Sequence, residues 1–315
     1  MSTAAACIAG DWGTSHLRLR LCAANGAELD AREGPGAAAA RGRFDQVFDE
    51  LTAGWRARHG ELPALLCGMV GSAFGWAEAP YLPCPEELDS VAGALVSPRP
   101  GVHIVPGMKC TNPLGAPDVM RGEETQLLGA LALAPALEHG RHLVCLPGTH
   151  TKWAALHDGT LLEFLTVPTG EVFKLLCDHS VLVRDRDTPI EPHAQEFERG
   201  LAEVAKHPEV PVMHRLFQSR SLRLDGQLSP QGAASWTSGL LIGTDVAGAL
   251  PLFGAPTADA AAGGVPVTIV ATPALSALYI TALARFGCRS EVVDGAAAAF
   301  AGLARVRESI TGALR

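Results

Sequence analysis

The chain has 315 residues, of which 48% are hydrophobic and 18% charged, enough for a sizeable buried core and about two domains. Its formal net charge of −8 is the wrong sign for a protein that neutralises phosphate backbones, which excludes nucleic acid as a partner. The eight cysteines form no C-x-x-C pair, a pattern typical of a reduced, cytoplasmic protein without disulfides or zinc.

The first seventy residues predict a small β-rich domain. Leucines alternate with polar residues in the second expected strand, and Asn25-Gly26 after it is a strong hairpin signal. Apolar residues from Phe44 to Trp55 recur at helical spacing. The order βββαβ resembles that of a ribonuclease-H-like domain. The expected elements are strands at 4–9, 16–21, 27–33 and 62–69 and a helix over 44–55.

A second meander begins halfway along the chain and matches the first in order. Its strands are expected at 143–146, 152–156 and 161–165. Gly148-Thr149 takes the place of Gly13-Thr14, and the hairpin turn Asp158-Gly159 takes the place of Asn25-Gly26. The repeat predicts an N-terminal domain over residues 1–138 and a C-terminal domain over residues 139–315.

Residues 80–117, between the meanders, are rich in Pro and Gly and are expected to be mostly loop. The uncharged stretch 260–284 contains two glycines and two prolines, so it predicts a strand and a helix, not a membrane span. Strand and helix alternate after the second meander, as in an α/β domain. The expected elements there are helices at 170–178, 193–207, 212–219, 231–250, 274–286 and from 296 onward, and strands at 265–271 and 288–293.

The turn from Asp11 to Ser15 lies between two strands and combines a carboxylate, a glycine and two hydroxyls. It suits phosphate and Mg²⁺, because the carboxylate can hold the ion through water while backbone N–H groups and hydroxyls bond phosphate oxygens. An ordinary hairpin uses the same residue types. The matching turn at Gly148-Thr149 favours the functional interpretation, in which two such turns bind one polyphosphate.

Other nucleotide and hydrolase motifs are missing from the sequence. None of the lysines follows a glycine, which excludes a Walker A loop, and no G-x-G-x-x-G follows an expected strand. Neither G-x-S-x-G nor H-E-x-x-H occurs. Phosphoryl transfer from a nucleotide held by hairpin turns is the chemistry that remains.

Two glutamates, Glu123 and Glu124, stand where a helix is expected to begin, just before the second meander. A carboxylate there can accept the proton of a hydroxyl as its oxygen attacks the terminal phosphoryl group. Glutamate in a first helical turn is also commonplace, because the helix dipole favours it. Arg121 beside them can bind an anionic substrate group, form a surface ion pair, or do neither.

Several segments resemble the signature blocks of the 2-dehydro-3-deoxygalactonokinase family, in family order and over nearly the whole chain. The resemblance implies an α/β fold of the actin-like ATPase and sugar kinase superfamily, in which two ribonuclease-H-like domains close an interdomain cleft on ATP and Mg²⁺. It implies phosphorylation of 2-dehydro-3-deoxy-D-galactonate at its terminal (6-) hydroxyl in galactonate breakdown. The segments are Ile8 to Ser15, Cys67 to Ser72 with Gly75-Trp76, Ala79-Pro80-Tyr81, Asp118 to Gln126, Leu146 to Trp153, Thr169-Gly170-Glu171 with His179-Ser180, and Gly239 to Gly243.

The resemblance also implies roles for single residues. Asp11 would organise Mg²⁺, and Glu123 would be the catalytic base, with Glu124 as its close competitor. Arg121 is the candidate for the substrate carboxylate, because a guanidinium suits a planar anion. Ser72 and Trp76 are candidates for substrate binding, although Trp76 and Phe74 can equally be core residues. The candidate phosphate ligands are Asp11, Gly13, Thr14 and Ser15 in the first motif and Gly148, Thr149, His150 and Lys152 in the second.

Adenosine would bind in the C-terminal domain, where Ala271-Thr272-Pro273 stands in place of the Gly-rich turn that related kinases often show. Two other functions are compatible with the same residues. One is a kinase for another sugar acid or an anhydro-sugar, and the other is a non-catalytic nucleotide-dependent sensor of the same superfamily. In each case the expected partner is a small molecule, with neither nucleic acid nor membrane involved.

Overall fold

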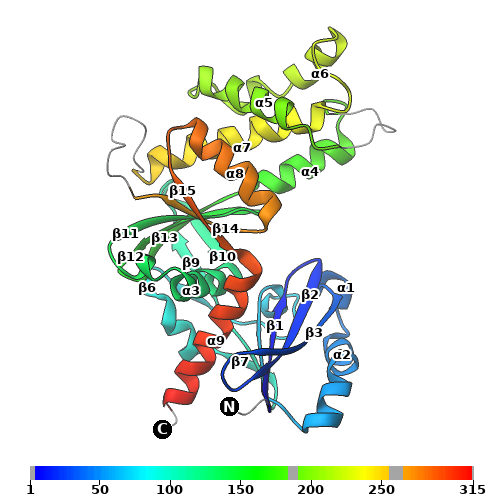
Figure 1. Ribbon diagram of the computed structural model, residues 1–315, viewed down its shortest axis with the longest axis vertical. Helices are drawn as coiled ribbons and strands as arrows, with labels where there is room; N and C mark the ends of the chain where they lie inside the picture. Colours follow the sequence, from blue (N-terminus) through cyan, green and yellow to red (C-terminus); the bar gives the residue numbers. More distant parts are fainter. Residues whose placement is uncertain (1–3, 184–190, 255–264, 314–315) are drawn as a thin grey trace. The chain divides into compact units, whose positions relative to one another are not determined.

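The structure is a computed structural model that describes residues 4–183, 191–254 and 265–313 (Figure 1). Contacts between residues divide the chain into two compact units. One consists of Met1–Gly140, Leu156–Phe164 and Val293–Arg315, and the other of Arg141–Ala155 and Leu165–Val292. The sequence placed a single boundary at 138/139. The C-terminal segment belongs to the first unit instead, because helix α9 (Gly295–Ala313) packs on helix α3 (Glu123–Leu133).

The first unit is built on a six-stranded sheet of order β3-β2-β1-β4-β8-β7. The meander β1-β2-β3 is antiparallel, β1 pairs in parallel with β4 and β4 with β8, and β7 pairs antiparallel with β8. The predicted order βββαβ is therefore confirmed. The strands are β1 (Ala5–Trp12), β2 (His16–Ala23), β3 (Glu28–Pro35), β4 (Ala64–Cys67), β7 (Val96–Arg99) and β8 (Val102–Ile104).

Leucine alternates with polar residues along β2, so the leucines lie on one face of the strand and contribute to the apolar core of the first unit. Leu17, Leu19 and Leu21 are each at most 2% exposed, and Phe48 and Trp55 of helix α2 belong to the same apolar cluster. Burying these side chains together is what holds α2 beside the meander (Figure 1). The helices here are α1 (Ala37–Ala40) and α2 (Phe44–His59).

Residues 80–117 contain more regular structure than the sequence predicted. Three of their short strands enter sheets with β10 or β13, while β7 and β8 enter the main sheet. Such strands have two to five residues, too few to show an alternating pattern among prolines and glycines. The remaining elements of this unit are β5 (Tyr81–Pro83), β6 (Glu86–Glu87), β9 (Gly107–Thr111), β10 (Pro117–Met120) and the 3₁₀ segments η1 (Met69–Gly71), η2 (Leu88–Ala94) and η3 (Pro135–Glu138).

A second six-stranded sheet has the order β15-β14-β11-β12-β13-β6. It contains the predicted second meander, whose hairpin turn has positive φ at both Asp158 and Gly159, 49° and 75°. The pairing of β11 with β14 is parallel, as expected for strands joined through helices. The strands are β11 (Arg141–Leu146), β12 (Thr151–His157), β13 (Thr160–Val167), β14 (Val267–Ala271) and β15 (Ser290–Asp294).

The helices of the second unit follow the predicted pattern except around residue 212. The expected helix over 212–219 is wrong: a 3₁₀ turn, η4 (Val212–His214), comes first, and a helix begins only at Gln218. Arg215 lies between the two and is buried, and its guanidinium donates to the carbonyls of Glu203 and His207. A polar side chain therefore occupies the buried position that an apolar residue of a continuous amphipathic helix would take. The helices are α4 (Thr169–His179), α5 (Ala194–Lys206), α6 (Gln218–Leu224), α7 (Ala233–Leu252) and α8 (Pro273–Arg285).

None of the helices in the described ranges is both long and apolar enough to cross a membrane. The strand and helix expected within 260–284 are present as β14 and α8, while residues 260–264 of that stretch lie outside the described residues.

Candidate active site

Three backbone segments of the first unit meet where strands β1 and β4 end and helix α3 begins. Gly68, directly after β4, has φ of 91°, and a Cβ added there would lie 2.9 Å from the carbonyl oxygen of Trp12. Gly122, directly before α3, has φ of 103°, and a Cβ added there would lie 3.2 Å from the Cα of Gly68. Both positions combine positive φ with close approach, which only glycine tolerates. The two glycines thus bring the start of α3 against the ends of both strands.

Asp11 lies at the end of β1, beside Cys67 in the parallel register with β4. Its side chain is 22% exposed, and Oδ2 lies 3.4 Å from Nη1 of Arg18. Burial raises the pKa of Asp11 above its usual value, and the charge of Arg18 opposes this effect. The carboxylate is therefore partly shielded, held by one weak ion pair, and still reachable by a ligand.

The buried thiol of Cys67 shows that the predicted acidic residues come together. Burial raises the pKa of this thiol, and the negative charges of Asp11, Glu124 and Glu123 raise it further. All three carboxylates therefore lie near enough to Cys67 to raise the pKa of its thiol, although Asp11 is separated from the glutamates by more than a hundred residues.

The two glutamates differ in burial. Glu124 is fully buried, accepts the N–H of Gly122 at 2.7 Å on Oε2, and accepts the hydroxyl of Thr125 at 2.9 Å on Oε1. Burial, with the charge of Glu123 next, raises its pKa from 4.5 to about 7. Both oxygens of Glu124 are occupied inside the protein, so this carboxyl has no surface for a substrate.

Glu123 is the first residue of α3 and is partly exposed. Its Oε2 accepts the N–H of Arg121 at 3.0 Å, which turns the carboxylate back over the turn that precedes the helix. The positive end of the α3 dipole favours the ionised form of a carboxyl at this place. Glu123 therefore has a fixed orientation and is partly exposed, as a general base must be.

Arg121 is 8% exposed and lies on the face of Tyr81, with its guanidinium carbon 4.2 Å from the ring centroid. Nη2 donates to the carbonyl of Ala79 at 2.7 Å, and Nε lies 3.4 Å from the hydroxyl of Tyr81. Nη1 is buried and has no hydrogen-bond partner among the described residues. A buried cation with an unsatisfied donor is costly, so this arrangement suits the binding of an anion.

The loop after β4 carries the two other substrate candidates. Ser72 is 9% exposed, and its backbone N–H closes the η1 turn by donating to the carbonyl of Met69 at 3.0 Å. Trp76 packs against Trp12 and Phe48, with ring centroids 6.2 and 5.5 Å apart. Its indole N–H donates to Asp45 at 3.0 Å. Of the two interpretations given for Trp76, this packing favours the core residue.

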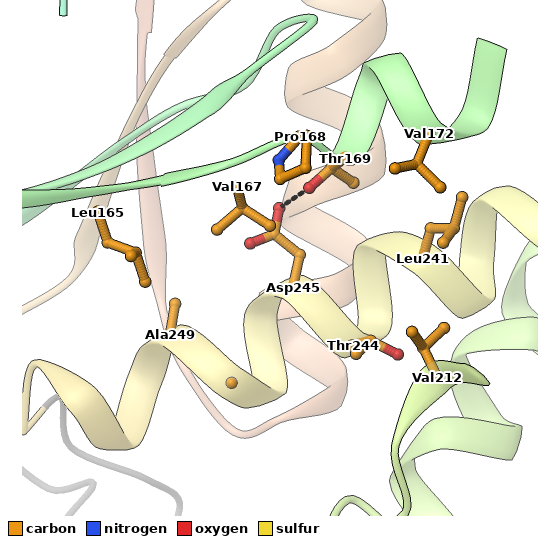
Figure 2. Close-up of a pocket in the computed structure, with 11 residues that line it drawn as sticks. Leu165, Val167, Pro168, Thr169, Val172, Val212, Leu241, Thr244, Asp245 and Ala249 are labelled. Carbon is orange, nitrogen blue, oxygen red and sulfur yellow. Dashed lines mark hydrogen bonds between the residues drawn. The ribbon is translucent and has the colours of Figure 1, made fainter. Parts of the chain in front are cut away.

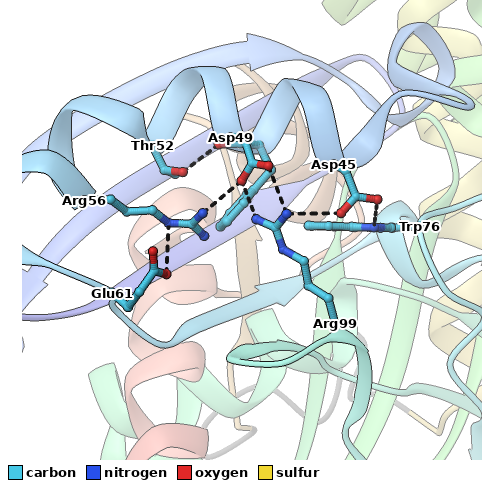
Figure 3. A network of polar contacts seen from close by, with 8 residues as sticks. Asp45, Asp49, Thr52, Arg56, Glu61, Trp76 and Arg99 are labelled. Carbon is cyan, nitrogen blue, oxygen red and sulfur yellow. Dashed lines mark hydrogen bonds and ion pairs between the residues drawn. The ribbon is translucent and has the colours of Figure 1, made fainter.

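A network of ion pairs on helix α2 fixes this loop from outside (Figure 3). Arg99 pairs with Asp45, the acceptor of Trp76, and with Asp49, whose second partner is Arg56. The hydrogen bond from Arg99, strengthened by the charges of both arginines, holds the pKa of Asp49 below its usual value. Figure 3 shows Arg99 reaching between the two aspartates, so the network connects α2, β7 and the Trp76 loop.

The turn between β1 and β2 is tied down by its backbone. The carbonyls of Gly13 and Thr14 accept the N–H groups of Ala37 and Ala38 at 2.9 and 3.1 Å, at the start of α1. The side chains of Thr14 and Ser15 are exposed. Because the carbonyl oxygens are used internally, the turn presents hydroxyls to its surroundings, as a phosphate-binding turn should.

The corresponding turn of the second unit, between β11 and β12, is packed against the start of α4. A Cβ on Gly170 would clash with the carbonyl oxygen of Gly148, and the N–H of Glu171 donates to the carbonyl of Thr149 at 2.9 Å. Nε2 of His150 lies 2.8 Å from the carboxylate of Glu171. This turn is therefore supported by a helix N-terminus, an arrangement that favours anions.

Lys152 does not lie in that turn. It stands on β12, is 5% exposed, and donates from Nζ to the hydroxyl of Thr166 on β13 at 2.7 Å. Its position is thus within the sheet, one strand residue beyond the start of β12.

Asp245 on α7 is the centre of a buried network in the second unit. Its carboxylate accepts from the indole of Trp153 at 2.8 Å and from the hydroxyls of Thr169 and Tyr279, each at 2.7 Å. Tyr279 in turn lies 2.9 Å from the hydroxyl of Thr151. Burial raises the pKa of Asp245, opposed by these hydrogen bonds. The network joins β12, α4, α7 and α8 and so fixes the elements on both sides of the Gly148 turn.

A cavity of about 270 Å³ lies beside this network (Figure 2). Its walls are mostly aliphatic, including Leu165, Val167 and Leu241, and the Asp245 carboxylate at its edge is bonded to Thr169 (Figure 2). The hydroxyl of Thr244 donates to the carbonyl of Leu240 at 2.8 Å. The cavity therefore suits an uncharged apolar group, not a phosphate.

Sequence reasoning missed Tyr81, Asp45 and Asp245 as parts of the site. Tyr81 was quoted only as part of a motif, and its place under the Arg121 guanidinium follows from the small sheet β10-β9-β5. Asp245 had a sequence signal, since it is the one acidic residue in the otherwise uncharged stretch 233–252 of α7. An isolated carboxyl in an apolar helix is buried only when it is paired.

Comparison with known proteins points to one family. The family model for 2-keto-3-deoxy-galactonokinase matches residues 11–306. The Rhizobium meliloti (strain 1021) protein named "Probable 2-dehydro-3-deoxygalactonokinase DgoK1" is 37% identical, covering 98% of this chain and 99% of that protein. The Escherichia coli (strain K12) protein named 2-dehydro-3-deoxygalactonokinase is 34% identical, covering 96% of this chain and 98% of that protein.

Solved structures agree on the fold. A Sinorhizobium meliloti crystal structure that carries the same family name has a TM-score of 0.84 at 34% identity and covers 96% of this chain and 99% of its own. An activator of 2-hydroxyisocaproyl-CoA dehydratase from Clostridium difficile, solved with bound ADPNP, has a TM-score of 0.51 at 10% identity and covers 98% of this chain and 96% of its own.

The protein thus has the α/β fold of the actin-like ATPase and sugar kinase superfamily, as the sequence predicted. Within that class, the chain belongs to the 2-keto-3-deoxy-galactonokinase family, which confirms the resemblance seen in its motifs.

Proposed function

We propose that this protein is an ATP-dependent kinase that phosphorylates 2-dehydro-3-deoxy-D-galactonate at its terminal (6-) hydroxyl, in galactonate breakdown. Family membership supports the reaction. The observation that carries the assignment to this site is the partly exposed carboxylate of Glu123 two residues after Arg121, whose buried Nη1 has no hydrogen-bond partner among the described residues. A sugar acid has both groups that such a pair would recognise, a carboxylate and a reactive hydroxyl.

Arg121 is the proposed ligand of the substrate carboxylate. Its Nη2 and Nε already have partners, which fixes the guanidinium plane and leaves Nη1 to donate to an incoming anion. The ring face of Tyr81 stabilises the positive charge of Arg121 before an anion binds. Ser72, on the neighbouring loop, is a further candidate contact.

Glu123 is the proposed catalytic base, in preference to Glu124. The base must lie within hydrogen-bonding reach of the hydroxyl whose proton it takes. Glu123 is partly exposed, whereas both oxygens of Glu124 are bonded inside the protein. We assign to Glu124 the role of fixing the Gly122 turn through the N–H that it accepts.

The phosphates of ATP are proposed to bind the two hairpin turns, through Gly13, Thr14 and Ser15 in one unit and Gly148, Thr149 and His150 in the other. The exposed hydroxyls of the first turn and the helix-supported backbone of the second are suitable donors. Lys152 would contribute positive charge from the adjacent strand. Adenosine would bind to the second unit.

Asp11 is the proposed Mg²⁺ ligand. The described residues contain no cluster of three or more potential metal-ligating side chains. Mg²⁺ in kinases commonly uses only one or two protein carboxylates together with phosphate oxygens and water, so a single, partly shielded Asp11 fits the ion. When bound, Mg²⁺ would neutralise charge on the transferred phosphoryl group.

The test is a coupled ADP-release assay across 2-keto-3-deoxy sugar acids and neutral sugars, run on wild type, Glu123→Gln, Glu124→Gln and Arg121→Met. Among the sugar acids, we expect only the galactonate derivative to be phosphorylated. We expect no turnover with the neutral sugars. Glu123→Gln should lower kcat by about 10²- to 10⁴-fold, with Glu124→Gln much closer to wild type as the matched control. Arg121→Met should raise KM for the acid by roughly 10-fold or more while leaving KM for ATP unchanged.

Turnover of another sugar acid or of an anhydro-sugar, but not of the galactonate derivative, would show that the protein acts on a different substrate from the one proposed. ATP binding without turnover on any member of the panel would favour a nucleotide-dependent sensor of the same superfamily. Equal losses of kcat in both glutamine variants would contradict the assignment of the base.

A further inference from the structure

Cys7 on β1 and Cys22 on β2 lie directly opposite each other in the antiparallel register, at the far end of β1 from Asp11. Opposite residues of such strands have Cα atoms about 4.5 to 5.5 Å apart. Disulfide-bonded cysteines have Cα atoms about 4.4 to 6.8 Å apart. The thiol of Cys22 donates to the carbonyl oxygen of Arg20 at 3.8 Å. The pair therefore has the backbone spacing that a disulfide needs.

An arginine from the last helix is fixed beside this pair. Nη1 of Arg307 lies 3.0 Å from the sulfur of Cys7. The same guanidinium donates to the carbonyl of Ala23 at 3.3 Å and to that of Ala24 at 3.0 Å. These two backbone contacts hold the positive charge against β2, next to the thiol.

The surroundings make the two thiols unequal. The neighbouring Cys22 thiol, supported by Arg307 and opposed by burial, lowers the pKa of Cys7. The neighbouring Cys7 thiol, together with burial, raises the pKa of Cys22. One sulfur is thus prepared as a nucleophile, and its neighbour remains a protonated thiol.

Cys7 is 7% exposed, but it lines two cavities of the first unit. One has a volume of about 400 Å³ and is also lined by His103 and Arg307. The other has a volume of about 50 Å³ and is also lined by Cys22. Either cavity has room for a molecule as small as hydrogen peroxide.

Four other cysteines have thiols whose pKa is raised. Cys67 and Cys145 are fully buried, and burial raises the pKa of both thiols. Burial raises the pKa of Cys84 to about 12 and also raises that of Cys288. These four cysteines serve as internal references within the same molecule.

We propose that Cys7 and Cys22 form a peroxide-reactive dithiol site, in which Cys7 is the attacking sulfur, Cys22 the resolving sulfur, and Arg307 the residue that places a positive charge against the sulfur of Cys7. The proposal is independent of the kinase activity, because it concerns the opposite end of β1 from the candidate active site.

Hydrogen peroxide is the only oxidant that this reaction needs. The Cys7 thiolate attacks one oxygen of hydrogen peroxide, the O–O bond breaks, hydroxide leaves, and Cys7 becomes a sulfenic acid. The sulfur of Cys22 then attacks the sulfur of Cys7, water leaves with the thiol proton, and the Cys7–Cys22 disulfide forms. Two thiols are oxidised and one peroxide is reduced to two waters. A small dithiol reductant reverses the step.

The experiment is mass spectrometry of the full-length protein after graded hydrogen peroxide treatment at pH 7, followed by digestion with trypsin without reduction. Cleavage after arginine separates the two cysteines, into the peptides 1–18 and 21–32. We expect these peptides to become linked, with the loss of two hydrogen atoms, before Cys67 or Cys145 changes. Dithiothreitol should separate them again.

Two variants test the assigned roles. Cys22→Ser removes the resolving sulfur, so a sulfenic acid should accumulate on Cys7 and be trapped by dimedone. Arg307→Gln should slow the oxidation of Cys7 several-fold, because it removes the positive charge that lies 3.0 Å from the attacking sulfur. Cys145→Ser is the matched control and should react like wild type.

Wild-type protein decides the proposal even if a variant fails to fold. Oxidation of Cys7 no faster than that of Cys145, or a linked peptide pair that does not include both Cys7 and Cys22, would overturn it. An Arg307→Gln variant with native circular dichroism and an unchanged rate of Cys7 oxidation would remove Arg307 from the mechanism.

Discussion

Glu124 is ionised at pH 8 in the folded protein although it is fully buried. Its pKa rises from 4.5 to about 7 on folding, mainly by burial and next by the charge of Glu123. The difference corresponds to a destabilisation of the folded state of about 3 kcal/mol when the carboxyl is charged. This is a substantial part of the net stability of a typical domain.

The direction of the pH dependence follows from proton counts. Between about pH 4.5 and pH 7 the folded state holds more protons on Glu124 than the unfolded state does. The free energy of unfolding therefore falls as pH rises through this window, and it levels off above pH 7. An ion-paired carboxyl, whose pKa is lowered, would give the opposite slope.

Glu124→Gln removes the titration and can keep both contacts. The amide oxygen can accept the N–H of Gly122, and the amide nitrogen can donate to the hydroxyl oxygen of Thr125. We expect the variant to gain about 2.5 kcal/mol relative to wild type between pH 5 and pH 8. Urea unfolding, followed by tryptophan fluorescence at each pH, measures this difference, and subtraction cancels the titration of other groups.

Glu123→Gln is the control. It removes a charge that raises the pKa of Glu124, so the pH dependence should weaken without disappearing. A difference between Glu124→Gln and wild type that stays constant from pH 5 to pH 8 would refute the reasoning, because it would mean that the buried carboxyl does not titrate in this range.

Further substitutions test the supports of the site. Gly170→Ala places a Cβ against the carbonyl of Gly148, so the turn must shift, and we expect a higher KM for ATP at unchanged KM for the sugar acid in steady-state assays. Asp45→Ala removes the acceptor of the Trp76 indole, and we expect a loss of about 1 kcal/mol in urea unfolding, since Asp45 is largely exposed. Asp245→Ala leaves three buried donors unpaired, and we expect a loss of at least about 3 kcal/mol in the same assay. An unaltered Tm in Asp245→Glu, whose longer side chain displaces the carboxylate from these donors, would argue against that role.

Local patterns explain why much of the fold was predictable. The leucine alternation in β2 and the helical spacing from Phe44 to Trp55 are set by neighbouring residues, and both elements formed as expected. The repeated hairpin turns followed from dipeptides that tolerate positive φ. The short strands within 80–117 were not predictable, because two to five residues among prolines carry no periodicity.

The residue types of the candidate site were readable in the sequence, because the Gly-Thr turn at 13–14 recurs at 148–149 in a second meander. The assignment of roles was not. Glu123 and Glu124 are adjacent and chemically identical, and only burial separates a charged residue at the surface from one that is bonded on both oxygens inside. Trp76 was open between two roles until its indole partner, 31 residues earlier, was seen.

Sequence alone determined the two meanders, their matching turns and the family, since each depends on residues close together in the chain or on motifs in a fixed order. Tertiary structure decided which side chains meet: Asp11 with the glutamates around Cys67, Arg121 over Tyr81, and Cys7 beside Arg307, 300 residues away. The physical reason is that the pKa of a carboxyl or a thiol depends on burial and on partners that only chain packing brings near. The same packing decides whether each N–H donor of a guanidinium has a hydrogen-bond partner.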